Sequence, residues 1–109
     1  MKKIIMLATI AGFAAALTAS AADGKALWTQ HCALCHGADG KGQTNIGKRL
    51  GCKDYTDAKV QDALTDAAAV KTIKEGLKDK DGKTVMKPTA GLSDEEVNAL
   101  VAYLRTFKK

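Results

Sequence analysis

The chain has 109 residues, a length that suits one small domain. Its 17 lysines and arginines against 12 acidic residues give a formal net charge of +5, and no run of like charges is long enough to indicate a nucleic-acid-binding arm. Only 5% of the residues are aromatic, so the side chains alone make a thin core, and a buried apolar group from outside the chain would supply the missing volume.

The first residues have the regions of a secretory signal peptide. Lys2 and Lys3 form a positive start, Ile4–Leu17 is an apolar run, and a stretch of small residues follows. An uncleaved membrane anchor is the alternative, but threonine, serine and glycine interrupt a segment that barely reaches the ~20 apolar residues of a span. We predict a signal peptide over residues 1–22 and one domain over residues 23–109, which keeps 15 basic and 12 acidic residues.

A helix is predicted over residues 23–36, with Leu27 and Trp28 on its apolar side. Gly24 lies one turn before Trp28 and lowers helix propensity. It either lets another helix cross closely at this point or belongs to a frayed first turn.

This helix ends in a C-x-x-C-H pattern, formed by Cys32, Cys35 and His36, which is typical of c-type haem attachment. Residues three apart lie on one helix face, so both cysteines can form thioethers to the two vinyl groups of one porphyrin. His36 follows at once, and its imidazole can coordinate the iron. His31 adjoins Cys32 on the same helix and cannot easily reach the opposite face of the porphyrin, so we predict a surface residue.

Three other interpretations of the cysteine pair stay open. A thioredoxin-like pair should follow a strand in a βαβ pattern, and none is readable here. A structural disulfide needs no further residue. A zinc site needs a fourth ligand, and Cys52 is available, but it has no second paired-ligand spacing.

Residues 37–43 form a glycine-rich loop, whose glycines we expect to let the backbone wrap closely around an edge of the haem. The spacing of Gly42, Gly47 and Lys48 resembles a phosphate-binding loop. Arg49 stands where that loop needs serine or threonine, and no strand precedes it, so we do not predict nucleotide binding. Lys48 and Arg49 either pair with a haem propionate or are solvated.

Two short helices are predicted in the middle of the chain. Asp57 is the N-cap of the first, which runs to Leu64. The second starts near Asp66 and has Gly76 near its end. Its apolar residues at helical spacing are Val70, Ile73 and Leu77. Residues 78–83 are predicted to form a polar turn.

Met86 lies in a segment, residues 84–88, that is predicted to be extended because Pro88 biases the preceding residue away from helix. It is the only methionine left once the signal peptide is removed. A lone methionine is usually core filler. Here it lies on an irregular segment downstream of an attachment site that lacks a sixth ligand, so we predict that its thioether binds the iron opposite His36.

The last helix has the clearest signals in the chain. Ser93 and Glu96 have the spacing of a capping box, and acidic residues occupy the first turn. Its apolar stripe consists of Val97, Leu100, Val101 and Leu104. We expect it to cross the Gly24–Trp28 helix, and no segment of the chain shows convincing strand alternation.

Taken together, these motifs resemble a class I cytochrome c of the small bacterial monohaem type over the whole mature chain. The resemblance rests on Cys32, Cys35 and His36, on the glycine-rich loop after them, on Met86 before the last helix, and on that helix itself. It implies an all-α fold with crossed N- and C-terminal helices, and shorter helices and loops wrapped around one covalently bound haem c.

The resemblance also implies a function. A protein of this kind carries one electron between periplasmic or membrane redox partners, through Fe(II)/Fe(III) with His–Met ligation, and is not an enzyme. It would be exported to the periplasm and act as a monomer or in transient complexes, with neither nucleic acid nor stable membrane insertion. The lysines that are candidates for steering an acidic partner are Lys41, Lys48, Lys83 and Lys87.

The sequence departs from that family's pattern in two places. Family members often have a proline after the glycine-rich loop that helps orient the histidine, and residues 44–47 contain none, so no acceptor for His36 is assigned. Cys52 is extra, and it is either a small buried hydrophobe or an exposed thiol. One hypothesis is that Cys52 mispairs with Cys32 or Cys35 before haem arrives.

Two functions compete with a free carrier. One is a catalytic haem domain, such as a peroxidase-like subunit, whose sixth coordination site is open. The other is a permanently docked electron-entry subunit of a larger enzyme, which the sequence does not distinguish from a shuttle.

Overall fold

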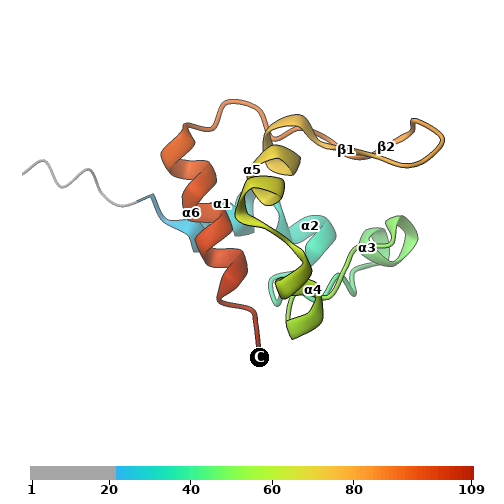
Figure 1. Ribbon diagram of the computed structural model, residues 1–109, viewed down its shortest axis with the longest axis horizontal. Helices are drawn as coiled ribbons and strands as arrows, with labels where there is room; N and C mark the ends of the chain where they lie inside the picture. Colours follow the sequence, from blue (N-terminus) through green and yellow to red (C-terminus); the bar gives the residue numbers. More distant parts are fainter. Residues whose placement is uncertain (1–21) are drawn as a thin grey trace, which may run out of the picture.

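The computed structural model describes residues 22–109, and the predicted signal peptide lies outside them except for its last residue. The elements in chain order are α1 (Gly24–His31), α2 (Ala33–His36), α3 (Asn45–Leu50), α4 (Ala58–Ala63), α5 (Asp66–Glu75), β1 (Leu77–Lys78), β2 (Thr84–Met86) and α6 (Asp94–Arg105). Helices α1 and α6 lie at one end of the folded part, α3 and the two strands extend toward the other, and α4 and α5 lie between (Figure 1).

The terminal helices α1 and α6 cross at Gly24. A Cβ atom at this position would lie 2.5 Å from the carbonyl oxygen of Ala99 and 3.0 Å from the Cβ atom of Tyr103. The first turn of α1 is not frayed, because the Asp23 carboxylate accepts a hydrogen bond from the Ala26 N–H. The prediction of a close helix crossing is therefore confirmed.

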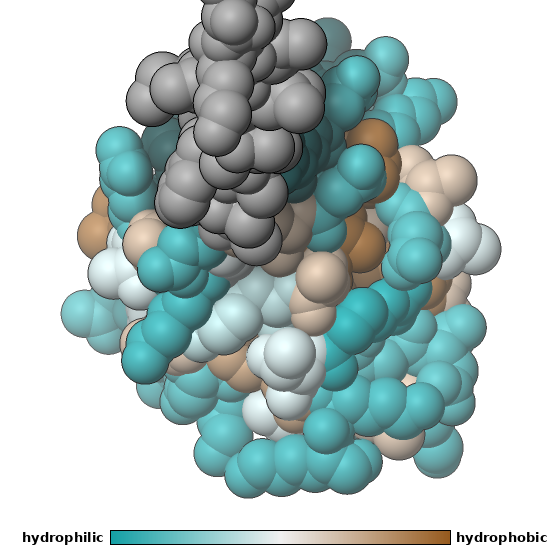
Figure 2. Space-filling view, turned by 90° about the vertical axis from the view of Figure 1, so that its left-hand side faces the viewer, coloured by the Kyte–Doolittle hydropathy of each residue, from teal (hydrophilic) through white to brown (hydrophobic). Residues whose placement is uncertain are grey.

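The core lies where α1, α5 and α6 meet. The predicted stripe of α6 is buried, and Trp28 of α1 and Ile73 of α5 pack in the same cluster. On the outer side of this end, hydrophilic residues cover most of the visible face, and hydrophobic residues show only in small separate areas (Figure 2). The helices thus turn their apolar sides inward.

Local capping fixes where the helices begin. The Ser93 hydroxyl accepts from the Glu96 N–H and the Glu96 carboxylate accepts from the Ser93 N–H, so the predicted capping box is present. Asp57 caps α4 as predicted, by accepting from the Lys59 N–H. The helix α3 was not predicted. Its N-cap is Thr44, whose hydroxyl accepts from the Gly47 N–H.

The end of α5 differs from the prediction. Leu77 was assigned to this helix by its spacing, but the helix ends at Glu75, because Gly76 takes φ 76° and turns the chain. Leu77 instead opens β1 and is half exposed. The spacing continued past the end of the helix by coincidence.

The two strands form a short antiparallel ribbon that the sequence analysis did not predict as paired strands. Leu77 pairs with Met86 and Lys78 with Thr84, with an irregular register between the two pairs. The predicted polar turn joins them, where the Asp79 carboxylate accepts from the Asp81 and Lys83 N–H groups. Segments of two and three residues are too short to show alternation, so only the extended character of residues 84–86 was predictable.

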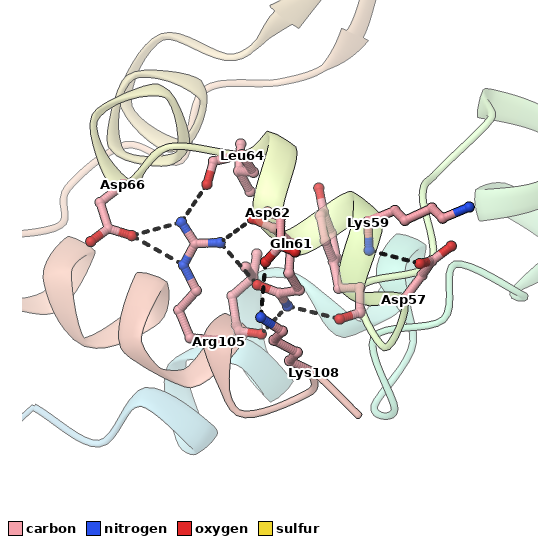
Figure 3. A network of polar contacts seen from close by, with 10 residues as sticks. Asp57, Lys59, Gln61, Asp62, Leu64, Asp66, Arg105 and Lys108 are labelled. Atoms are coloured by element: carbon pink, nitrogen blue, oxygen red, sulfur yellow. Dashed lines mark hydrogen bonds and ion pairs between the residues drawn. The ribbon is translucent and has the colours of Figure 1, made fainter.

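A buried polar network attaches the junction between α4 and α5 to α6 (Figure 3). Gln61 is only 2% exposed, and its amide donates to the carbonyl oxygens of Tyr55 at 2.7 Å and Leu104 at 2.8 Å. Arg105 donates to the carbonyl and side-chain oxygens of Gln61 at 2.8 and 2.9 Å, and also to Leu64 and Asp66. Every polar atom of the Gln61 side chain is therefore satisfied without water.

We expect Arg105→Met to lower the free energy of unfolding by about 2–3 kcal/mol, because it removes charged donors from carbonyl groups that stay buried. The matched variant Lys108→Met loses only the exposed pair with Asp62 and should cost less than ~1 kcal/mol. Urea unfolding of the purified proteins, followed by circular dichroism, measures both. Equal effects of the two variants would contradict this account of the network.

Candidate haem site

The cysteine–histidine motif lies at a break between two helices. The single helix predicted over residues 23–36 is divided at Cys32, whose φ of −120° ends α1 and starts α2. Cys32 is buried, while Cys35 and His36 are partly buried. The short helix α2 brings the predicted residues together, since the His36 N–H donates to the Cys32 carbonyl oxygen at 3.0 Å.

All three cysteines are free thiols. Burial, with a smaller contribution from Cys35, raises the pKa of Cys32 to about 11. Burial and then Cys35 also raise the pKa of Cys52. Cys52 is partly buried, so it is neither the fully buried hydrophobe nor the freely exposed thiol that the sequence analysis considered. The structure contains no disulfide between the pair, which leaves both thiols available for thioether formation.

The His36 ring has two aromatic neighbours. Its centroid lies 5.7 Å from that of Trp28 and 5.6 Å from that of Tyr55. Burial lowers the pKa of His36 and so favours the neutral imidazole, which is the form that binds metals. Its Nδ1 atom is buried and has no hydrogen-bond partner, so the acceptor that was unassigned from the sequence is not found among the described residues.

Two contacts hold the segment after the motif. The Trp28 indole N–H donates to the Gly37 carbonyl oxygen at 2.9 Å, and the Gly42 N–H donates to that of His36 at 2.9 Å. The predicted loop is present, but the close neighbours of its glycines are protein atoms. A Cβ atom at Gly40 would lie 2.6 Å from the Phe107 ring, and one at Gly42 would lie 2.7 Å from the Cys52 carbonyl oxygen. These protein neighbours are enough to require glycine at both positions, and the expected approach to a haem edge stays a prediction.

Sequence reasoning missed Thr44. Its hydroxyl donates to the Cys35 carbonyl oxygen at 2.6 Å and accepts from the Gly47 N–H at 2.8 Å, so it joins α2 to α3. A Cβ atom at Gly47 would collide with the same Cys35 carbonyl oxygen. A threonine three residues before a glycine is an N-cap signal, but its reach back to the motif depends on the folded loop.

Tyr55 is the second residue that the sequence did not indicate. Its N–H donates to the Gly40 carbonyl oxygen at 2.9 Å, and its carbonyl oxygen accepts from Gln61. Burial, and after it Cys52 and Cys32, raise the pKa of the Tyr55 phenol. The ring lies beside His36 and packs against the buried cluster that contains Cys32.

Met86 comes from a different part of the fold. It is partly buried at the end of β2, at the base of the ribbon and opposite Leu77. His31 is exposed, as predicted. Lys48 and Arg49 are exposed too, and pairing of either with a haem propionate stays open. The role of Met86 as an iron ligand stays a prediction.

The residues present fit a covalently held haem. Two free thiols and a neutral imidazole, whose ring nitrogen has no protein partner, lie together on one turn of chain. Within residues 22–109, no group of three or more histidine, cysteine, aspartate or glutamate side chains is arranged to hold a metal ion, as the zinc interpretation would require. Across the same residues, no helix is long and apolar enough to cross a membrane.

We expect Thr44→Val to lower the free energy of unfolding by about 1–3 kcal/mol, because the buried Cys35 carbonyl oxygen and the first turn of α3 both lose a partner. Thr44→Ser keeps the hydroxyl and should stay within ~1 kcal/mol of the parent. Thermal unfolding of the three proteins gives the comparison. If serine, which keeps the hydroxyl, is as damaging as valine, the hydrogen bonds of the hydroxyl do not account for the loss of stability.

Comparison with known proteins places this site in a described family. The family model "Cytochrome c" matches residues 21–108. Cytochrome c-554(547) of Halothiobacillus neapolitanus is 34% identical over 93 residues, covering 81% of this chain and 97% of that protein. Cytochrome c-553 of Helicobacter pylori is 32% identical over 109 residues, covering 99% and 100%. The solved structure of the KustC0563 c-type cytochrome superposes with a TM-score of 0.69 at 40% identity, covering 80% of this chain and 99% of that one.

Proposed function

The chain belongs to the cytochrome c family, and we propose that it carries single electrons between periplasmic or membrane redox proteins with its iron held by His36 and Met86. Its mainly helical structure has the class I cytochrome c fold, and the family carries covalently bound haem c. The haem, when bound, supplies a one-electron Fe(III)/Fe(II) couple.

The observation that supports the site assignment is the arrangement on α2. Cys32 and Cys35 are free thiols three residues apart, and His36 presents a neutral imidazole directly after them. We assign the two cysteines to the thioether bonds and His36 to one axial position. The aromatic rings of Trp28 and Tyr55 limit how far that imidazole can turn.

Met86 is our candidate for the other axial position. It is the only methionine in the described residues, and it pairs with Leu77 at the end of β2. A soft thioether stabilises the ferrous more than the ferric state and so raises the reduction potential. With both axial positions filled by the chain, no coordination site is open for a peroxidase-like reaction, and we infer that the protein is not an enzyme.

The exposed lysines indicate what kind of partner it meets. Lys48 lies in α3, and Lys83 and Lys87 lie on either side of β2, all exposed, while Lys41 is partly buried in the loop. Lysines on one protein attract an acidic surface on another and raise the rate of encounter. We propose acidic redox proteins as donor and acceptor, met in small, short-lived complexes in the periplasm after the signal peptide is removed.

Met86→Ala tests the ligand assignment. We expect the midpoint potential to fall by about 0.1–0.3 V, part of the ~0.8 V over which axial ligands set haem potentials, with conversion of the ferric protein to high spin. Val85→Ala removes a partly buried neighbour of similar exposure and should leave both properties almost unchanged. A low-spin Met86→Ala protein with the parent potential would contradict His–Met ligation.

Counting thiols tests the attachment residues. In the denatured, reduced holoprotein, we expect an alkylating reagent to label one cysteine, Cys52, because the other two are thioethers. Peptide mass spectrometry identifies the labelled residue, and apoprotein made without haem, labelled at all three cysteines, is the control. Labelling of Cys32 or Cys35 in the holoprotein would overturn the assignment.

In the native holoprotein, Cys52 should react slowly at neutral pH. Burial raises its pKa above the ordinary value of 9.0, so the reactive thiolate becomes abundant only as the pH rises beyond that value. The rate of alkylation measured from pH 7 to pH 10.5 checks this. A rate that is already at its plateau at pH 8 would show a thiol that is more acidic than the structure implies.

A further inference from the structure

Gly76 lies where the chain leaves α5 and enters the ribbon that carries Met86. Its backbone has φ 76° and ψ −171°, a combination that only glycine adopts without strain. Its N–H donates to the Thr72 carbonyl oxygen at 2.8 Å, so this turn is held to the last turn of α5. The position of the turn is therefore set by the helix and not by the exposed ribbon.

The missing side chain of Gly76 also lets a second segment come close. A Cβ atom built at this position would collide with the Met86 carbonyl oxygen, and would lie 2.8 Å from the nitrogen and 2.9 Å from the Cδ atom of Pro88. Backbone and proline-ring atoms cannot rotate away, as the end of a long side chain can. A methyl group at Gly76 therefore has to push the Met86–Pro88 backbone outward.

A second contact fixes the same segment from its other end. The Thr89 N–H donates to the Ile73 carbonyl oxygen at 2.8 Å, and Ile73 is itself buried in the core between α5 and α6. Together, Gly76 and the Thr89–Ile73 hydrogen bond hold the segment Met86–Thr89 against the C-terminal end of α5. We call this pair of contacts the α5 anchor.

We propose that the α5 anchor, with Gly76 at its centre, is the device that positions the Met86 sulfur for iron binding. The proposal rests on the proposed function, in which Met86 is the axial ligand. Gly76 is a positioning residue, because it acts through the backbone of Met86. The turn of the ribbon, residues 79–83, contributes little to the position of Met86, because its residues are exposed.

Two other glycines provide a matched control. Gly82 and Gly91 have φ of 79°, close to that of Gly76, but a Cβ atom at either meets nothing within 4 Å. Alanine at any of the three positions has the same unfavourable φ. Only at Gly76 does it also displace the segment that carries Met86. A difference between Gly76→Ala and the two controls therefore excludes the positive φ alone as the cause.

The experiment is a titration of the ferric holoproteins with imidazole, which binds the iron only where the Met86 sulfur has left it. The apparent affinity for imidazole rises in proportion to the fraction of molecules whose sixth position is free. We expect Gly76→Ala to bind imidazole about ten-fold or more tightly than the parent, and Gly82→Ala and Gly91→Ala to stay within about two-fold. Met86→Ala gives the upper limit.

The outcomes separate the two proposals. If the parent already binds imidazole as tightly as Met86→Ala, then Met86 is not a ligand, and the proposed ligation fails. If Met86→Ala binds much more tightly but Gly76→Ala matches Gly82→Ala and Gly91→Ala, the ligation holds and the α5 anchor is refuted. A ten-fold rise for Gly76→Ala alone supports both.

The Thr89 contact gives an independent test should Gly76→Ala yield no holoprotein. Thr89→Pro removes the N–H that bonds to Ile73, while Thr89→Ala removes the side chain and keeps that N–H. We expect Thr89→Pro to raise imidazole affinity about three-fold or more, and Thr89→Ala to leave it within about two-fold. Equal affinities for these two variants would overturn the proposal.

Discussion

The side chain of Trp28 connects the helix crossing to the haem site. It is buried where α1 meets α6, and its ring lies 5.0 Å from that of Phe107 and 5.7 Å from that of His36, measured between centroids. Its indole N–H also closes the loop after the motif by bonding to Gly37. A change in the crossing would therefore move the imidazole and the loop together. In a chain with few aromatic residues, this one tryptophan both packs the helix crossing and positions the residues of the site.

The second aromatic neighbour of the imidazole, Tyr55, is held in place by a polar network. Tyr55 packs against His36, and its backbone is held through Gln61, which Arg105 and the carbonyl oxygen of Leu104 fix to α6. Both aromatic neighbours of the ring are thus held in place by the C-terminal helix α6. This explains why a short helix of four residues, which has little stability of its own, keeps its histidine in place. A carrier gains from such an arrangement, because a ligand that does not move adds little rearrangement to electron transfer.

The sequence revealed the features whose signals are local. The capping box at Ser93 and the stripe of α6 each lie within a few residues, and each was found where predicted. The contacts of Thr44 with α2 and of Gly76 with β2 join segments nine or more residues apart, and no spacing rule reports them. The same limit explains the error at Leu77, where periodicity extended a helix that a glycine had already ended. The prediction that Met86 is an axial ligand rests on resemblance and on its context in the sequence. The structure adds the position of its backbone.

The two proposed iron ligands are held in different ways. His36 would follow two covalent tethers and has two aromatic neighbours, so its position would be determined within a few residues of the haem attachment. Met86 has no covalent tether, and its backbone is fixed by the strand pair with Leu77, by its contact with Gly76 and by the hydrogen bond from Thr89 to Ile73. Met86 is therefore held less firmly than His36. Water can replace its contacts, and movement of the exposed ribbon can break them. It follows that the ferric state, which binds soft sulfur less strongly than the ferrous state, depends most on the packing of α5.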